Sequence, residues 1–228
     1  MRGISISHAA MIRYGQRIIE PATIEFAPGS CVGLVGLNGA GKTTWLYGLA
    51  GFIPNAAPAI HARDHEIKSF GLLLQHPTLP EWLTVAEVLE LLVRPSPLLS
   101  ALAARWRIDA LLNRKAGHLS KGQTQLIGAI ITLESRHTLR CLDEPFAALD
   151  LTRRRELIRR LLALRHEGDD VTILTAQVAS DLYETCTDIL MLRDGELRVV
   201  GSVEEMSAYG GRDPRAVFEE CIVMLLTE

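Results

Sequence analysis

The sequence has few cysteines and no long apolar run, and both absences limit the class of protein. Its four cysteines, at positions 31, 141, 186 and 221, form no CxxC pair. This spacing argues against a disulfide framework and favours a reducing compartment. No apolar run approaches the roughly 20 residues of a membrane-spanning helix, and the opening residues MRGISISHAAM lack the apolar core of a signal peptide. We therefore expect a soluble, cytoplasmic protein.

The sequence also lacks an excess of positive charge. It carries 24 Lys and Arg against 27 Asp and Glu, a formal net charge of −3, whereas non-specific nucleic-acid binding generally needs a basic face. Five arginines do recur along one predicted helix, at positions 153, 154, 155, 159 and 160. A local basic patch is the alternative there, but a solvated helix face explains the pattern. We expect no nucleic-acid partner.

What the sequence does contain is an alternation of strand-like and helix-like segments. Apolar runs of strand length cover residues 4–7, 23–26, 31–35, 70–75, 138–142, 171–175 and 189–192. Helix-like patterns cover residues 42–50, 85–93, 98–112, 123–134 and 153–165. Unbroken apolar runs are typical of strands buried on both faces of a parallel sheet. The alternation predicts an α/β fold.

One region interrupts this alternation. From about residue 77 to 134 the chain shows successive helical patterns and no convincing strand. We therefore predict a single domain over residues 1–228, with an α/β core of about 1–76 and 136–228 and a helical subdomain of about 77–135. The segment 54–63, rich in proline and alanine, predicts an irregular loop.

The segment CVGLVGLNGAGKTTW, residues 31–45, fits the phosphate-loop pattern GxxxxGK[ST] between a predicted strand and a predicted helix. Glycines let the backbone wrap a polyphosphate while its N–H groups point inward. The positive end of the following helix faces the anion. Lys42 is expected to reach the β- and γ-phosphates, and Thr43 to offer its hydroxyl to Mg²⁺. The predicted nucleotide-binding residues are Gly36, Asn38, Gly39, Ala40, Gly41, Lys42, Thr43 and Thr44.

Two adjacent acids, Asp143 and Glu144, follow the apolar run 138–142. An aspartate at the end of such a strand, beside a phosphate loop, can hold Mg²⁺. The next acid can orient an attacking water, which makes hydrolysis possible. The phosphate loop alone does not choose among kinases, GTPases and transport ATPases. A GTPase would need a guanine-reading NKxD, and that tetrapeptide is absent from the sequence.

The segment His118-Leu119-Ser120-Lys121-Gly122-Gln123 lies between these two motifs. It resembles the LSGGQ signature of ATP-binding-cassette (ABC) transporter ATPases, and the order of the other motifs agrees over roughly residues 4–200. Tyr14 matches the aromatic residue that stacks on adenine, and Gln75 matches the Q-loop glutamine. The segment 146–150, FAALD, matches the D-loop.

The resemblance implies a fold, a cofactor and a set of roles. The fold is a P-loop NTPase core with an N-terminal antiparallel β segment and an inserted helical subdomain. ATP with Mg²⁺ binds between two subunits packed head to tail, as a homo- or heterodimer. Thr43, Gln75 and Asp143 form the metal shell, and Glu144 orients water. The partner subunit's nucleotide is contacted by Ser120, Lys121, Gly122 and Gln123.

The sequence departs from the family pattern at two positions. Lys121 stands where glycine is usual in the signature, and we expect this to be tolerated. Gln177 occupies the position of a histidine that contacts the γ-phosphate. A glutamine can donate a hydrogen bond but cannot become cationic or relay a proton. We therefore predict slow ATP hydrolysis, with a nucleotide-binding switch or assembly subunit as the alternative.

The end of the chain bears on the kind of transporter. The segment 214–227, PRAVFEECIVMLLT, has an amphipathic helical pattern and is similar to the closing helix of ABC-2-type exporters, although a plain packing helix explains it equally well. The resemblance implies a separate transmembrane permease as partner, and it favours export as the direction of transport. It also implies a location on the cytoplasmic face of the membrane, with membrane contact through that partner only. A soluble ABC ATPase without a pore is a further alternative.

Overall fold

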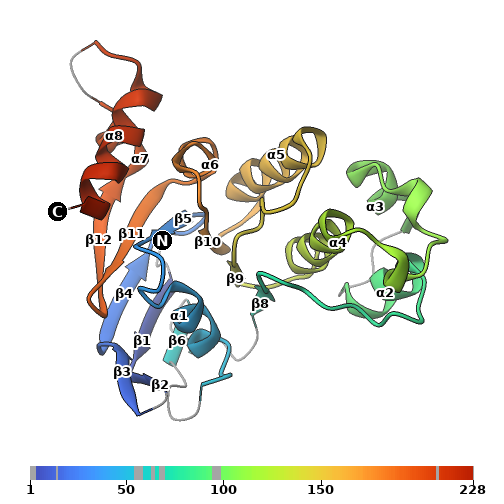
Figure 1. Ribbon diagram of the computed structural model, residues 1–228, viewed down its shortest axis with the longest axis horizontal. Helices are drawn as coiled ribbons and strands as arrows, with labels where there is room; N and C mark the ends of the chain where they lie inside the picture. Colours follow the sequence, from blue (N-terminus) through green and yellow to red (C-terminus); the bar gives the residue numbers. More distant parts are fainter. Residues whose placement is uncertain are drawn as a thin grey trace.

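The computed structural model describes residues 4–13, 15–53, 59–62, 65–66, 70–93, 99–208 and 211–227, with the backbone alone for 59–62 and 65–66. Its centre is a six-stranded sheet in the order β12-β11-β5-β10-β9-β8 (Figure 1). The strands are β5 (Cys31–Val35), β8 (Gly71–Leu73), β9 (Leu139–Leu142), β10 (Val171–Thr175), β11 (Asp188–Arg193) and β12 (Glu196–Ser202).

Five of these six strands run parallel, and only β12 pairs antiparallel, with β11. Every residue of β5, β9 and β10 is buried, as expected of strands covered on both faces. The predicted α/β fold is therefore confirmed. Because the carboxyl ends of β5, β8, β9 and β10 lie at one edge of the sheet, the segments that follow these strands meet there.

A smaller antiparallel sheet lies beside the first, in the order β4-β1-β6-β7, with a separate hairpin of β2 and β3. These strands are β1 (Ile4–His8), β2 (Met11–Arg13), β3 (Gln16–Ile19), β4 (Ala22–Phe26), β6 (Ala59–Ala62) and β7 (His65–Glu66). The prediction of an irregular loop over 54–63 was wrong for Ala59–Ala62, which pairs with β1. Alanine carries little strand preference, so backbone pairing with β1 decides this strand.

Between β8 and β9 the described residues form helices and turns, together with one isolated bridge from Thr84 to Lys115. The helical elements are α2 (Val85–Leu92), α3 (Leu99–Trp106), η1 (Asp109–Leu111), η2 (Ala116–His118) and α4 (Lys121–Glu134). Figure 1 shows α2, α3 and α4 gathered at one end of the molecule. The helix predicted over 98–112 ends at Trp106, because Arg107 adopts a left-handed φ of 51° that stops an α-helix.

The remaining helices cover the two faces of the central sheet. They are α1 (Lys42–Leu49), α5 (Leu151–Glu167), α6 (Ala179–Thr185), α7 (Val203–Ser207) and α8 (Pro214–Thr227). Helix α1 shares one hydrophobic cluster with the smaller sheet, while α4, α5, α6 and α8 share the other. No helix among the described residues is long and apolar enough to cross a membrane.

Three of the six arginines of α5 form ion pairs within the described residues. Arg153 pairs with Glu156 at 3.0 Å, Arg154 pairs with Asp181, and Arg160 pairs with Glu134 at 2.9 Å and with a second glutamate, Glu167, at 2.7 Å. Much of the positive charge that the sequence places on this helix is therefore balanced by acids on α4, α5 and α6.

Candidate nucleotide site

The phosphate loop connects the buried strand β5 to α1, and two of its glycines are required by the backbone path. A Cβ on Gly36 would lie 2.4 Å from the Leu192 carbonyl oxygen. Gly41, the N-cap of α1, has a left-handed φ of 104°, and a Cβ there would lie 2.9 Å from Ile18 Cγ2. The loop is thus pressed between β11 and β3, which side chains would prevent.

Lys42 extends across this loop from the first position of α1. Its Nζ donates to the Gly36 carbonyl oxygen at 2.7 Å and to the Leu37 carbonyl oxygen at 3.1 Å. Burial lowers the pKa of Lys42, and the carboxylates of Glu144 and Asp143 oppose that shift. The side chain therefore places a cationic donor at the mouth of the loop, beside the amino end of α1, where an anion is favoured.

Asp143 follows β9 and is only 2% exposed. Its Oδ2 accepts a hydrogen bond from Thr43 Oγ1 at 2.8 Å, and its Oδ1 accepts one from Thr175 Oγ1 at 2.8 Å. The structure thus brings Thr43 and Asp143 together, although 100 residues separate them. A hydroxyl and a carboxylate are the oxygen ligands that Mg²⁺ prefers, so the pair fits the metal that the sequence predicts.

Glu144 is half-buried and has a left-handed backbone, with φ of 49°. A non-glycine residue in this conformation costs about 1–3 kcal/mol unless its surroundings hold it there. Its N–H donates to Thr175 Oγ1 at 2.8 Å, and its carbonyl oxygen accepts from Gln125 Nε2 at 3.2 Å. These two contacts hold the strained backbone of Glu144 in place.

Gln177 meets that side chain. Its Nε2 donates to Glu144 Oε2 at 2.7 Å, and the Gln177 side chain is exposed. Gln177, which is predicted to stand at the position of the family's histidine, therefore contacts Glu144, the second of the two acids. The amide holds the carboxylate by a hydrogen bond and cannot exchange a proton with it.

Sequence reasoning missed two residues of this network, Thr175 and Gln125. The Thr175 hydroxyl both donates to Asp143 and accepts from Glu144. Gln125 lies on the buried face of α4 at 4% exposure. A signal for Thr175 was present, because this hydroxyl residue ends a buried strand that pairs with β9, the strand before the two acids. Only the packing of α4 against the acids brings Gln125 there.

The signature segment begins α4 and is organised locally. Ser120 is the N-cap: its Oγ accepts from the Gln123 N–H at 3.2 Å, while Gln123 Oε1 accepts from the Ser120 N–H at 3.0 Å. This reciprocal arrangement is a capping box. A Cβ on Gly122 would lie 2.2 Å from the Ala148 carbonyl oxygen, so the predicted signature and D-loop segments touch. Ser120 and Lys121 are exposed.

The other predicted site residues lie outside the hydrogen-bonded series at Asp143 and Glu144. Gln75 is half-buried two residues beyond β8, at the same sheet edge as the acids. Asn38 and Gly39 are exposed, whereas Thr44 is buried at 7% exposure. Ala40 is half-buried and donates its N–H to the Leu37 carbonyl oxygen at 3.1 Å. Tyr14, the expected adenine platform, lies outside the described residues.

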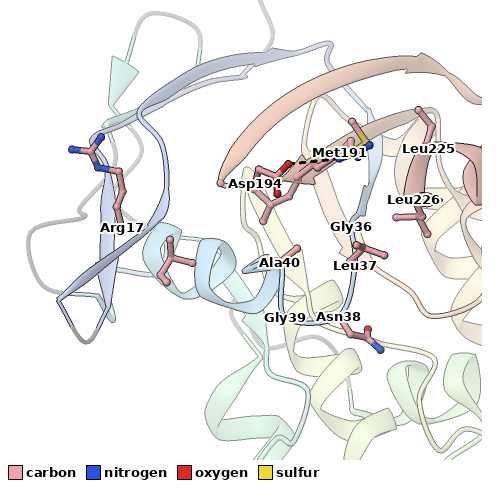
Figure 2. A pocket seen from close by; sticks show the side chains of 14 residues that line it. Arg17, Gly36, Leu37, Asn38, Gly39, Ala40, Met191, Asp194, Leu225 and Leu226 are labelled. Carbon is pink, nitrogen blue, oxygen red and sulfur yellow. Dashed lines mark ion pairs between the residues drawn. The ribbon is translucent and has the colours of Figure 1, made fainter. Parts of the chain in front are cut away.

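On the side of the phosphate loop that faces β11, away from the two acids, the structure contains a cavity. A cavity of about 440 Å³ opens there between the loop, the β11–β12 turn and the last turn of α8 (Figure 2). Volumes of 300–1,000 Å³ are typical of small-molecule sites. The loop therefore stands between a polar network at Asp143 and Glu144 and an open cavity beside β11.

Comparison with known proteins agrees with this geometry. The family model described as ABC transporter matches residues 19–147. The chain is 29% identical over 200 residues to the thiamine import ATP-binding protein ThiQ of Vibrio cholerae, covering 81% of this chain and 84% of that protein. It is 31% identical over 215 residues to a probable sulfate/thiosulfate import ATP-binding protein CysA of Chlorella vulgaris, covering 86% of this chain and 89% of that protein.

The fold comparison points the same way. The structure of an ATP-binding subunit of an ABC transporter superposes with a TM-score of 0.76 at 22% identity, covering 94% of this chain and 98% of that one. At this identity the likeness supports the fold alone. The family match spans more than half of the 228 residues and includes the phosphate loop, the signature segment and both acids. The chain therefore belongs to the ABC transporter family, whose ATP-binding domains are ATPases.

Proposed function

We propose that the chain is the ATP-binding subunit of a transporter, and that it binds and hydrolyses ATP to drive transport through a separate membrane subunit. The observation that carries the proposal is the hydrogen-bonded series Thr43–Asp143–Thr175–Glu144–Gln177 beside the phosphate loop. This series brings a hydroxyl, a carboxylate and a second acid together at one edge of the sheet. Packing alone would not require two acids and a strained backbone at this point.

Each residue then has a distinct role. Lys42 and the N–H groups of the loop bind the β- and γ-phosphates, while Thr43, Asp143 and Gln75 hold Mg²⁺. When bound, the metal neutralises charge that develops on the phosphates. Glu144 orients the attacking water as general base. The Thr175 hydroxyl is hydrogen-bonded to both Asp143 and Glu144. One side chain therefore positions both the carboxylate that holds the metal and the residue that acts as base.

Hydrolysis by the purified chain tests the proposal. We expect Mg²⁺-dependent release of phosphate from ATP, and loss of both ATP binding and hydrolysis in Lys42→Ala. Lys115→Ala is the matched control, because it removes an exposed lysine outside both the phosphate loop and the signature segment. Full ATP binding by Lys42→Ala would contradict the assignment of the phosphate loop.

We propose further that two copies, or one copy and a related subunit, close head to tail around ATP. The exposed Ser120 and Lys121 at the start of α4 leave the signature free to contact a partner's nucleotide, since the capping box satisfies Ser120 without a ligand. The helical subdomain of about residues 77–135 would carry this closure to the membrane subunit. Gel filtration of Glu144→Gln with ATP and Mg²⁺ should show a dimer, and a monomer under all conditions contradicts it.

The direction of transport stays a prediction. The C-terminal helix α8 favours export of the ABC-2 type, whereas both relatives compared above are import proteins by name. Import is therefore the alternative that these relatives favour. Co-purification with a multi-spanning membrane protein, followed by transport in vesicles, decides both the partner and the direction. It also tests the proposed location at the cytoplasmic face of the membrane.

A second candidate function rests on one contact. Gln177 donates to Glu144 at 2.7 Å, and this amide cannot take up a proton, so the chain could bind ATP and switch conformation with little turnover. The variant Gln177→His separates the two functions. A rise in turnover would show that this position limits the rate. An unchanged rate would show that Gln177 supports hydrolysis as well as histidine does.

A further inference from the structure

A buried carboxylate at the far end of α4 joins three helices. Glu134 is the last residue of α4, and its side chain is only 7% exposed. Its Oε1 accepts hydrogen bonds from Trp106 Nε1 at 2.8 Å and from Arg160 Nε at 2.9 Å. Its Oε2 accepts one from Arg105 Nη1 at 3.0 Å. We call Trp106, Glu134 and Arg160 the Glu134 cluster. These residues connect α3 and α4 to α5.

Trp106 is held by its backbone as well. It is the last residue of α3 and is fully buried, and Arg153 Nη1 donates to its carbonyl oxygen at 2.8 Å. Arg153 lies in the first turn of α5, where its N–H donates to Oδ1 of the N-cap residue Asp150 at 2.9 Å. Asp150 is also the last residue of the predicted D-loop segment, 146–150. The Glu134 cluster therefore connects the end of the D-loop with the end of α4.

The start of α4 contacts the same D-loop segment. A Cβ on Gly122, in the first turn of α4, would lie 2.2 Å from the Ala148 carbonyl oxygen. About 18 Å of α-helix separates Gly122 from Glu134. Figure 1 shows α4 next to α5, with α2 and α3 on its other side. Helix α4 is therefore held near its first residue and again at its last.

The Glu134 cluster fixes a position more than it adds stability. Burying Glu134 and Arg160 costs desolvation free energy that their pairing at best offsets, and apolar side chains of similar volume often hold helices together as well. Hydrogen bonds, in contrast, require defined distances and angles. A buried carboxylate with donors from two other helices therefore selects one arrangement of α3, α4 and α5.

We propose that the Glu134 cluster positions the signature segment. By holding the last residue of α4 to α5, it fixes where Ser120, at the other end of α4, meets the partner subunit's nucleotide. This rests on the proposed function, because the signature contacts a nucleotide only in the head-to-tail dimer. Trp106, Glu134 and Arg160 are positioning residues, since they act on that nucleotide through α4.

The first test is Glu134→Gln. The amide keeps the size of the side chain but has one acceptor oxygen, whereas the carboxylate uses two oxygens to bind three side chains. We expect turnover of ATP to fall about ten- to a hundredfold, because a small displacement of a distant group misplaces the reacting atoms. The Kd of the monomer for ATP should stay unchanged. Glu167→Gln is the matched control, because it removes an exposed carboxylate that also pairs with Arg160.

The dimer is measured directly in chains that also carry Glu144→Gln, which slows hydrolysis. Sedimentation of the full chain with saturating ATP and Mg²⁺ gives the dissociation constant of the dimer. We expect Glu134→Gln to raise this constant about tenfold, which corresponds to about 1.4 kcal/mol. Trp106→Phe removes only the indole N–H donor and keeps an aromatic ring, so it should raise the constant by a smaller factor, about two- to threefold.

A double variant separates positioning from stability. Glu134→Leu combined with Arg160→Met replaces the buried ion pair with apolar side chains of similar volume. The midpoint of thermal unfolding should stay close to that of the parent, while the dimer should remain as weak as in Glu134→Gln. If this variant does not fold, Glu134→Gln and Trp106→Phe, each measured well below its own unfolding midpoint, decide the question.

The outcomes separate this proposal from the proposed function. If Glu134→Gln and Trp106→Phe dimerise as tightly as the chain with Glu144→Gln alone, the Glu134 cluster does not position the signature. A double variant with both normal stability and a normal dimer also overturns the proposal, because packing is then sufficient. Weaker ATP binding by monomeric Glu134→Gln overturns it too, since the effect then reaches the phosphate loop. If Glu144→Gln alone stays monomeric with ATP and Mg²⁺, the head-to-tail dimer is wrong and both proposals fail.

Discussion

The phosphate loop separates two regions that differ in how firmly their side chains are held. On one side, which we call the acid flank, Asp143, Glu144, Thr175 and Gln177 form a continuous hydrogen-bonded series with distances of 2.7–2.8 Å. On the other, the cavity flank, an open space is lined by apolar side chains such as Leu37 and Met191 and by polar ones such as Asn38 and Asp194. Chemistry needs fixed polar groups, whereas ligand binding needs an accessible cavity. We therefore expect chemistry on the acid flank and ligand binding on the cavity flank.

This comparison predicts that substitutions on the acid flank change turnover and that those on the cavity flank change affinity. The largest effect is expected for Glu144→Gln, which should lower kcat for ATP hydrolysis by about 10²- to 10⁴-fold and leave the Kd for ATP nearly unchanged. Single-turnover phosphate release and a separate binding titration measure the two quantities.

Glu167→Gln is the control for that experiment, because it removes a carboxylate that pairs with Arg160 far along α5 from the acids. Turnover near the parent rate in Glu144→Gln would show that another group activates the water. The division of tasks between the flanks would then be wrong at its central residue.

Thr175→Val is expected to have the next largest effect. It leaves Asp143 Oδ1 and the Glu144 N–H without the partner that they share, which should lower the free energy of unfolding by about 1–3 kcal/mol. Misplacement of both acids should lower kcat about ten- to a hundredfold. Thr175→Ser keeps the hydroxyl and should restore both quantities.

A readout beyond stability distinguishes positioning from packing. If Thr175 orients Asp143, Thr175→Val should also raise the Mg²⁺ concentration needed for half-maximal rate. Loss of stability with an unchanged Mg²⁺ dependence would mean that the hydroxyl only supports the fold.

On the cavity flank, Leu37→Ala is expected to raise the Kd for ATP about two- to threefold without changing kcat, because an exposed leucine contributes part of an apolar contact. Val199→Ala, which truncates a similarly exposed residue on β12, is the control. An altered kcat in Leu37→Ala with unchanged affinity would reverse the proposed roles of the two flanks.

The smallest expected effect is on the pH dependence of stability, and it involves α1, the helix that follows the phosphate loop. Trp45 of α1 donates its Nε1–H to His8 Nε2 at 3.0 Å, and His8 Nδ1 lies 2.9 Å from the Ala9 carbonyl oxygen, so this histidine must be neutral. Burial lowers the pKa of His8 from 6.5, with the bond to Ala9 opposing the shift. The unfolded chain therefore binds the proton more readily, and stability is lost as the pH falls below 6.5.

Thermal unfolding between about pH 7 and pH 5.5 measures this dependence. His8→Gln keeps an acceptor for Trp45 but does not titrate, so its midpoint should fall less than that of the parent. Burial also lowers the pKa of His137, which contributes with the same sign, so the variant should lose only part of the slope. If the midpoint of His8→Gln changes with pH as much as that of the parent, His8 does not contribute to the pH dependence of stability.

The sequence predicted the central parallel strands and most helices, because unbroken apolar runs have few alternatives to a buried strand. It failed where backbone pairing decides the structure, as in Ala59–Ala62. In the site, it predicted Thr43, Asp143, Glu144 and Gln177, since each stands at a fixed distance from a recognisable motif. Thr175 and Gln125 carry no motif, and their roles come only from the strands and helix that surround them.

The sequence by itself determined that a triphosphate loop, a signature and two acids occur in a family-specific order. It did so because a tight phosphate-binding turn requires glycine and a metal site requires carboxylates. Both requirements fix the residue type at single positions of the sequence. Only the tertiary structure decided that one threonine hydroxyl joins both acids, and that the final helix closes a cavity on the other side. Such contacts join residues far apart in the chain, and no local preference encodes them.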